Sequence, residues 1–283
     1  MGGCMSSITD VYSPRTTFRC TRLRGAKVGG SVCQFCAVGC SQLGFFKDGK
    51  LIDVEGDPRS SVNEGRLCPK GSSTYALNEN PYRKVKPMYR APGSDHWEEV
   101  SLDWMLDTVA KRIWETRNKG FVEKDPKTRI TVNNCANIGF IGGSANDNEE
   151  CYLFRKLFTG GLGILPVENS ARYCHSTTVC ALSPTFGFGA CTNPPRDLLN
   201  SDCILIMGSN MAEAHPCAFY WPMQAKKKGT VTIHVDPRYT RTSAACDHHV
   251  HIRPETDIAF LSGIIRYLLE KELWFKEYVL AYT

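Results

Sequence analysis

The chain has 283 residues, of which 42% are hydrophobic and 22% charged, so it is a globular protein with enough length for two domains, and disorder is excluded as its main state. Its net charge of +5 is small for this length, and no basic run carries interleaved aromatic residues, so nothing points to nucleic acid as a partner. No apolar stretch approaches the ~20 residues that a membrane-spanning helix needs.

Residues 1–27 are polar and irregular, and we predict that they form a tail. They carry several basic residues but no apolar core after them, so neither a secretory nor a twin-arginine signal is visible. The chain has 14 cysteines without a regular disulfide-like spacing, which favours folding in a reducing or metal-assembling compartment. On this basis we expect a cytoplasmic location.

Four cysteines near the start of the chain have the spacing of a metal-cluster site. Cys33, Cys36 and Cys40 form a C-x2-C-x3-C run, and Cys68 follows after a longer interval. Three thiolates on one loop and a fourth returned to them can ligate one 4Fe-4S cluster. The alternatives are a structural zinc ion, for which paired C-x2-C motifs are typical, and ordinary buried cysteines.

A β-hairpin is predicted between the third and fourth of these cysteines. Residues 43–46 and 51–54 are apolar segments, and the Asp48-Gly49 pair between them suits a tight turn. The hairpin would fold the chain back so that Cys68 reaches the first three cysteines. We therefore predict a small β-rich 4Fe-4S domain over residues 28–90.

After residue 100 the pattern changes to alternating helices and strands. Ser101 is the predicted N-cap of one helix and Asp147 of a second, which ends at Gly160-Gly161. Each helix has apolar residues spaced for one buried face: Leu102, Leu106, Val109, Ala110 and Ile113 in the first, and Leu153, Phe154, Leu157 and Phe158 in the second.

A βαβ unit follows. Residues 203–207 and 230–235 are predicted parallel strands, and residues 212–227 are the crossover between them. The expected fold class is therefore α/β, with a doubly wound, Rossmann-like parallel sheet over residues 91–283. Residues 257–282 are predicted to be helical and to continue toward a further element, so we expect this region to be incomplete at its C-terminus.

The carboxyl ends of these strands are the expected ligand site. Gly208, Ser209 and Asn210 end the first strand, where backbone amides can meet phosphate oxygens. Asp236 ends the second strand, where it can accept hydrogen bonds from ribose hydroxyls, and Arg238 adds a fork for phosphate. The G-x-G-x-x-G motif of NAD-binding proteins is absent. The pattern indicates a nucleotide-bearing redox cofactor, and the alternative is an ordinary βα turn.

A cysteine and a histidine stand side by side after a predicted strand at residues 165–167. Cys174 offers a soft metal ligand, and His175 offers an adjacent proton acceptor. The alternative is that the pair is incidental. The signatures that surround the catalytic cysteine in Cys-His proteases are absent.

Together these segments resemble the catalytic subunit of molybdenum- or tungsten-dependent formate dehydrogenase. The resemblance extends from about residue 28 to 283, over only the N-terminal part of a longer subunit, and rests on residues 33–36, 68–71, 167–179, 208–216 and 235–242. Residues 89–95 are similar to the respiratory, membrane-associated branch, which implies a periplasmic location as the alternative. Cys180, Cys191 and Cys217 replace residues that are apolar or small in the family.

The resemblance implies the following roles. Cys174 ligates molybdenum or tungsten, held also by two molybdopterin guanine dinucleotides (bis-pterin), and His175 orients formate or takes up its proton. Electrons pass through a pterin, past Lys70, to the cluster. The residues implied to bind the guanine dinucleotide are Gly208, Ser209, Asn210, Glu213, His215, Asp236, Pro237, Arg238, Thr242 and Asp257.

The implied partners are formate, an iron–sulfur electron-transfer subunit, a membrane cytochrome in the respiratory branch, and the missing C-terminal half of the catalytic subunit. We expect the isolated chain to be a truncated or split subunit and inactive alone. Two alternatives remain, namely a non-catalytic electron-transfer module that keeps only the cluster, and a related enzyme such as nitrate reductase.

Overall fold

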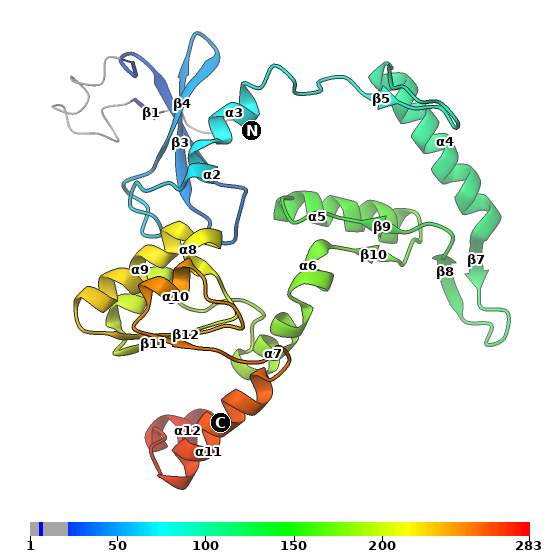
Figure 1. The fold of residues 1–283 in the computed structure, drawn as a ribbon. Helices are drawn as coiled ribbons and strands as arrows, with labels where there is room; N and C mark the ends of the chain where they lie inside the picture. Colours follow the sequence, from blue (N-terminus) through cyan, green and yellow to red (C-terminus); the bar gives the residue numbers. More distant parts are fainter. Residues whose placement is uncertain (1–5, 8–21) are drawn as a thin grey trace. The chain divides into compact units, whose positions relative to one another are not determined.

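The computed structural model describes residues 6–7 and 22–283 (Figure 1). The chain divides into two compact units. The first consists of Met1–Asn78 and Asn193–Thr283, and the second of Glu79–Thr192. Each unit is described by itself.

The N-terminal part of the first unit is an antiparallel sheet followed by two short helices. The sheet has the order β1-β2-β3-β4. Its elements, coloured blue to cyan in Figure 1, are β1 (Ser6–Ser7), β2 (Lys27–Val32), β3 (Ser41–Lys47), β4 (Lys50–Gly56), α2 (Pro69–Ser72) and α3 (Thr74–Asn78).

The predicted hairpin is confirmed as β3 and β4. Lys47 pairs with Lys50 across a loop of two residues. Both loop residues have left-handed backbone, with φ of 51° at Asp48 and 78° at Gly49. Asp and Gly tolerate this conformation, which matches the twist of the two strands.

The core of this sheet includes part of the predicted tail. Leu23 and Ala26 are buried together with Val28, Leu43 and Phe45. The tail prediction is therefore wrong for residues 22–27, because apolar side chains there gain free energy by covering the sheet. Ser6 and Ser7 of the predicted tail form strand β1, and residues 1–5 and 8–21 lie outside the described residues.

The C-terminal part of the first unit contains a parallel sheet of three strands with the order β11-β12-β13. The predicted βαβ unit is confirmed, because β11 and β12 pair in parallel and helices connect them. The elements are η3 (Pro195–Asn200), β11 (Cys203–Met207), α8 (Met211–Ala214), α9 (Pro216–Lys227), β12 (Val231–Val235), α10 (Arg241–Ala245), β13 (His248–Val250), α11 (Asp257–Glu270) and α12 (Lys276–Tyr282).

The predicted single helix over residues 257–282 is interrupted. Helix α11 ends at Glu270, and α12 begins at Lys276. Between them Glu272 has a left-handed φ of 52°, a conformation that cannot continue a right-handed helix. In the described part of the chain, no helix has the length and apolar composition to cross a membrane.

Helix α9 packs against the N-terminal part of the same unit. The Trp221 indole N–H donates to the Val62 carbonyl oxygen at 3.0 Å, and Trp221 is 2% exposed. The Arg66 guanidinium lies 3.6 Å from the centre of the Tyr220 ring, a cation–π contact. The compact units thus do not follow the predicted boundaries, in which residues 91–283 form one region, and those boundaries stay a prediction.

The second unit has short strand pairs and five helical segments in its described residues. The strand pairs are β5 with β6, β7 with β8, and β9 with β10. Its elements are β5 (Met88–Tyr89), β6 (Glu98–Glu99), α4 (Leu102–Gly120), β7 (Phe121–Lys124), β8 (Thr131–Cys135), β9 (Phe140–Ile141), α5 (Asn148–Arg155), the π-helix η2 (Lys156–Gly161), β10 (Val167–Glu168), α6 (Ser170–Cys174) and α7 (Ser176–Phe186).

The two predicted helices of this unit begin where expected. The Trp104 backbone N–H donates to the Ser101 hydroxyl at 3.2 Å, and the Asp147 backbone N–H donates to the Glu150 carboxylate at 3.0 Å. Both contacts satisfy backbone groups at a helix N-terminus. After α5, η2 ends at Gly161, which confirms the predicted end of the second helix.

The predicted buried faces of these helices are largely wrong. Helix α4 has no buried residue, and its predicted core residue Leu102 is 57% exposed. In the second helix Leu153 and Leu157 are exposed, whereas Phe154 and Phe158 pack on the Phe140 ring at 4.9 and 4.5 Å. A helical period shows which side chains share a face, but a partner surface is needed to bury that face, and the described residues supply one only for the two phenylalanines.

Candidate functional site

The four predicted cluster cysteines line one cavity. The loop that carries the first three is closed by the Cys33 backbone N–H, which donates to the Cys40 carbonyl oxygen at 2.8 Å. Cys68 stands directly before α2. Cys33 and Cys40 are buried, and Cys36 and Cys68 are partly exposed. The structure therefore brings together all four cysteines, as the sequence predicts, from both sides of the hairpin.

Two kinds of metal group can be held by four cysteine sulfurs, a single zinc ion or a 4Fe-4S cluster. Among the described residues, no group of three or more His, Cys, Asp or Glu side chains is placed to hold a single metal ion. A tetrahedral zinc ion with Zn–S bonds of about 2.3 Å draws its four sulfurs to within about 4 Å of one another. A 4Fe-4S cluster ligates each cysteine through a different iron. The C-x2-C-x3-C run with a fourth cysteine returned to it favours the cluster, since paired C-x2-C motifs are typical of structural zinc.

Burial also affects the protonation of the thiols. Burial, followed by the nearby Cys217, raises the pKa of Cys40 to about 12. Thiolates are the ligands of iron, so this site releases protons when it takes up its metal. The free energy of iron binding must therefore offset the free energy that deprotonation of the buried Cys40 thiol costs.

Lys70 joins the cysteine cavity to the parallel sheet. It lies in α2, two residues after Cys68, and lines the same cavity. Its ammonium group donates to the carbonyl oxygens of Glu213 and Ala214 at 3.4 and 3.3 Å. These carbonyls are at the C-terminal end of α8, where a cation is favourable. The position agrees with the bridging role predicted for Lys70, and the role itself stays a prediction.

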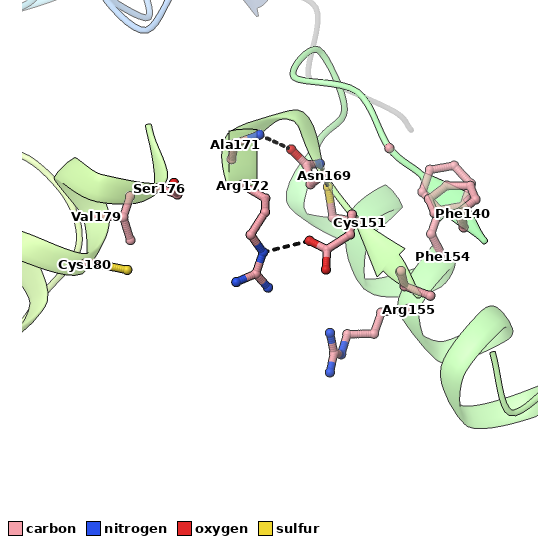
Figure 2. Close-up of a pocket in the computed structure, with 13 residues that line it drawn as sticks. Phe140, Cys151, Phe154, Arg155, Asn169, Ala171, Arg172, Ser176, Val179 and Cys180 are labelled. Carbon is pink, nitrogen blue, oxygen red and sulfur yellow. Dashed lines mark hydrogen bonds and ion pairs between the residues drawn. The ribbon is translucent and has the colours of Figure 1, made fainter. Parts of the chain in front are cut away.

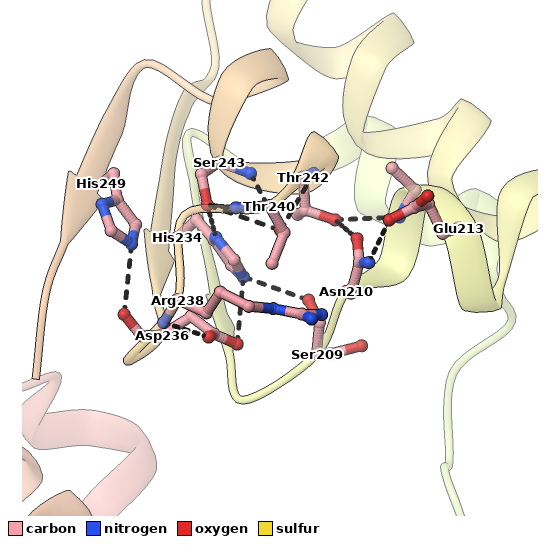
Figure 3. Close-up of polar contacts among 11 residues, drawn as sticks. Ser209, Asn210, Glu213, His234, Asp236, Arg238, Thr240, Thr242, Ser243 and His249 are labelled. Carbon is pink, nitrogen blue, oxygen red and sulfur yellow. Dashed lines mark hydrogen bonds and ion pairs between the residues drawn. The ribbon is translucent and has the colours of Figure 1, made fainter. Parts of the chain in front are cut away.

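Six of the predicted nucleotide-binding residues lie close together at the carboxyl edge of the sheet (Figure 3), namely Ser209, Asn210, Glu213, Asp236, Arg238 and Thr242. Gly208 has a left-handed φ of 64°, which glycine adopts without strain. The Thr242 hydroxyl donates to the Asn210 side-chain oxygen at 3.0 Å and accepts from the Ala212 backbone N–H at 2.9 Å. Asn210 also hydrogen-bonds to Glu213. These contacts hold the loop after β11 against α10.

Asp236 and Arg238 stand at the end of the neighbouring strand. The Arg238 backbone N–H donates to the Asp236 carboxylate at 2.7 Å, with Pro237 between them. Arg238 also lines an open cavity of about 410 Å³ with Glu213, Tyr239, Thr240, Arg241 and Ala244. A guanidinium in a cavity of this size suits a phosphate-bearing ligand.

His215 and Asp257, the two remaining predicted residues, differ in their surroundings. The His215 Nδ1 atom is buried without a hydrogen-bond partner among the described residues, and a buried polar atom of this kind is expected to meet a ligand or water. Asp257 begins α11 and makes no hydrogen bond or ion pair with the other predicted residues in the described part of the chain. The residues at this edge, Asp257 apart, fit a nucleotide-bearing cofactor.

A buried histidine supports this edge from within the sheet. His234 is fully buried; its Nδ1 lies 2.8 Å from the Ser243 hydroxyl and its Nε2 lies 3.1 Å from the Ser209 carbonyl oxygen. Because a carbonyl only accepts, Nε2 carries the proton and Nδ1 accepts from Ser243. Burial lowers the pKa of His234 below its ordinary value. Nothing in the sequence around His234 indicates this role, since a histidine within an apolar strand gives no local signal.

We expect His234 to make folding depend on pH. Below its ordinary pKa of 6.5 the unfolded chain binds a proton that the folded chain refuses, so this contribution to stability is present above pH 6.5 and lost as the pH falls below it. His234→Gln should weaken the fall in urea midpoint between about pH 7.5 and 5.5. His248→Gln, at an exposed position of β13, is the control. An equal pH response in wild type and His234→Gln would contradict this account.

Cys174 and His175 lie in the second unit. Cys174 is the last residue of α6 and is exposed, and His175 stands between α6 and α7. Nearby, a cavity of about 430 Å³ is lined by residues of α5, β9, β10, α6 and α7. Figure 2 shows Ser176, Val179 and Cys180 of α7 on one side of this cavity and Phe140, Phe154 and Arg155 on the other. The sequence analysis did not single out this cavity.

Arg172 gives this cavity a charged wall. Its guanidinium pairs with the Glu168 carboxylate at 2.7 Å (Figure 2), and the pair raises the pKa of Arg172 further. Asn169 caps α6 by accepting from the Ala171 backbone N–H at 3.0 Å. The loop that leads to Cys174 is thus held by local polar contacts.

The fold and these sites define a class of protein. A four-cysteine cavity in an N-terminal β domain, next to a parallel sheet with a nucleotide-binding edge, is the arrangement of an iron–sulfur protein with a nucleotide-bearing redox cofactor. Residues 26–80 match the molybdopterin oxidoreductase Fe4S4 domain, and residues 83–273 match the molybdopterin oxidoreductase domain. The chain belongs to the molybdopterin oxidoreductase family, and this confirms the predicted 4Fe-4S and molybdopterin cofactors.

Known proteins of similar sequence include formate dehydrogenase subunits. The chain is 52% identical over 260 residues to formate dehydrogenase subunit alpha of Megalodesulfovibrio gigas, covering 91% of this chain and 26% of that protein. It is 46% identical over 262 residues to formate dehydrogenase 2 subunit alpha (cytochrome c-553) of Nitratidesulfovibrio vulgaris, covering 93% and 26%. The chain therefore spans about a quarter of the length of these relatives.

A solved structure supports the fold. The acetylene hydratase of Pelobacter acetylenicus is similar with a TM-score of 0.68 and 22% sequence identity, over 88% of this chain and 33% of that one. This likeness confirms a mixed helix and strand fold, and the family match of residues 26–80 gives the cluster domain at its N-terminus.

Proposed function

We propose that the chain forms the cluster-bearing and first pterin-binding part of a formate dehydrogenase catalytic subunit. The observation that carries the proposal is the contact of Lys70 with the Glu213 and Ala214 carbonyls. It joins the cavity of the four cysteines to the cofactor edge within one compact unit. The identity of 46–52% with formate dehydrogenase alpha subunits supports formate as the substrate.

The reaction is the oxidation of formate to carbon dioxide, a proton and two electrons. When bound, a molybdenum or tungsten ion with two pterin guanine dinucleotides supplies the two-electron acceptor. Cys174 would hold that metal as a thiolate, since sulfur suits these soft ions. The neighbouring His175 would orient formate or accept the proton. Lys70 would lie on the electron path to the cluster, which takes one electron at a time.

The residues at the sheet edge would bind the guanine dinucleotide. In this proposal Arg238 meets phosphate and Asp236 meets ribose hydroxyls. The His215 Nδ1 atom would find there the partner that the described residues do not give it. The three-stranded sheet would be part of a larger, doubly wound sheet in the whole subunit.

The proposed partners are an iron–sulfur subunit that receives the electrons and, in a respiratory enzyme, a membrane cytochrome. The name of the Nitratidesulfovibrio vulgaris relative, which includes cytochrome c-553, supports a cytochrome as an acceptor. The rest of the catalytic subunit would complete the pterin site. A cytoplasmic and a periplasmic location both stay predictions.

Elemental analysis of anaerobically purified protein tests this function. We expect about four irons per chain, together with molybdenum or tungsten and acid-extractable guanine nucleotide. Formate-dependent dye reduction by the enzyme that contains this chain is the matching activity. Iron with neither molybdenum nor tungsten would support the electron-transfer module instead. One zinc and no iron would overturn the cluster and the proposed function together.

A further inference from the structure

A fifth sulfur lies in the cluster cavity. Cys217 lines the same cavity as the four predicted ligands, and its residue is 7% exposed. It is the second residue of α9, so it reaches the cavity from the α/β part of the unit rather than from the cluster domain. Its side chain packs with Cys33 and Cys40 in one buried group.

The contacts of Cys217 place its thiol against a ligand sulfur. Cys68 also packs against the buried group that Cys217 forms with Cys33 and Cys40. The Cys217 sulfur also lies 3.7 Å from the Arg66 carbonyl oxygen, which offers the thiol proton a second, neutral acceptor.

The charge of the bound cluster decides between these two acceptors. At neutral pH an unligated cysteine carries a proton, whereas an iron-bound cysteine is a thiolate. A hydrogen bond to a charged acceptor is stronger than one to a neutral carbonyl. With a cluster bound to Cys40, the Cys217 S–H would therefore favour the Cys40 thiolate over the distant Arg66 carbonyl oxygen.

We propose that Cys217 is a positioning residue that raises the reduction potential of the 4Fe-4S cluster through an S–H hydrogen bond to Cys40. This inference rests on the cluster in the proposed function. A bound cluster would accept one electron without making or breaking a bond, and its ligand sulfurs would then become more negative. A donor aimed at one of them stabilises the reduced state more than the oxidised state.

The test is a redox titration of the cluster followed by electron paramagnetic resonance in the complete enzyme. Cys217→Val removes the donor and keeps the volume and burial of the side chain. At a fixed potential we expect its ratio of reduced to oxidised cluster to fall about three- to tenfold, where tenfold corresponds to about 59 mV for one electron. Cys217→Ser, which restores a donor, should return the ratio toward wild type.

A cysteine outside the cavity provides the control. Cys246 is partly exposed in the same compact unit and packs with the sheet core rather than the cluster cavity. Cys246→Val should leave the titration unchanged. An unchanged potential in Cys217→Val with full iron content would overturn the inference and leave the proposed function intact.

Iron content separates two further outcomes. Loss of iron in Cys217→Val would show that Cys217 is itself a ligand, which overturns the tuning role. Absence of iron from the wild-type protein would overturn both this inference and the proposed function. Full iron content with a lowered potential, restored by serine, supports the inference.

Discussion

Replacing Cys68 by serine is expected to remove the cluster, so that iron falls from about four per chain to near zero. Cys68 returns to the first three cysteines from the far side of the hairpin and stands directly before α2. A hydroxyl is a poor iron ligand, so the iron that Cys68 would hold loses its protein thiolate and the cluster is destabilised. Iron analysis and the visible absorbance of the anaerobically purified variant measure the loss.

In the Cys68→Ser variant, the Cys217 sulfur in the same cavity could take the place of Cys68 as a ligand. Cys217 lies close to Cys68, so the double variant Cys68→Ser/Cys217→Val is tested beside the single one. Cys203→Ser, at an exposed position of β11, is the matched control and should keep its iron. Full iron in the double variant would contradict the assignment of Cys68 as a ligand.

Replacing Cys174 by alanine is expected to lower formate-dependent dye reduction in the complete enzyme by at least about a thousandfold. The methyl group cannot ligate the metal, and the adjacent His175 then has no metal-bound substrate to orient. Steady-state rates at saturating formate measure the effect. Iron content should be unchanged, since Cys174 lies outside the cluster cavity.

The Cys203→Ser variant is also the control for the Cys174→Ala prediction. Cys203→Ser removes a thiol from the sheet and should keep both its activity and its iron. A Cys174→Ala enzyme with wild-type turnover would show that the cysteine is not a ligand of the reacting metal. The cluster would remain assigned, because its residues are tested separately.

Several features could be predicted because neighbouring residues determine them. The Asp48-Gly49 pair adopts the two left-handed conformations of the predicted turn, and Ser101 caps its helix as expected. The parallel pairing of β11 with β12 also follows its pattern of apolar strand, helix and apolar strand. In each case the residues that predict the element are the same residues that form it.

Burial was predicted less well because it depends on distant partners. Leu102 and Leu153 have the spacing of a buried face but are exposed. Leu23 and Ala26 stand in a polar segment but are buried under the sheet. Periodicity shows which face of a helix or strand is the most apolar, whereas packing against another element decides which face is buried.

The site shows the same division. The sequence alone predicted the four cluster cysteines and the strand end at Asp236 to Arg238, because the spacing of ligands and the end of a strand depend on neighbouring residues. The tertiary structure alone decided that Cys217 enters the cluster cavity, that Lys70 reaches the end of α8 and that His234 supports Ser209 from inside the sheet. These contacts join segments far apart in the chain, and only the packing of α8, α9 and the sheet against the cluster domain brings them within hydrogen-bonding distance.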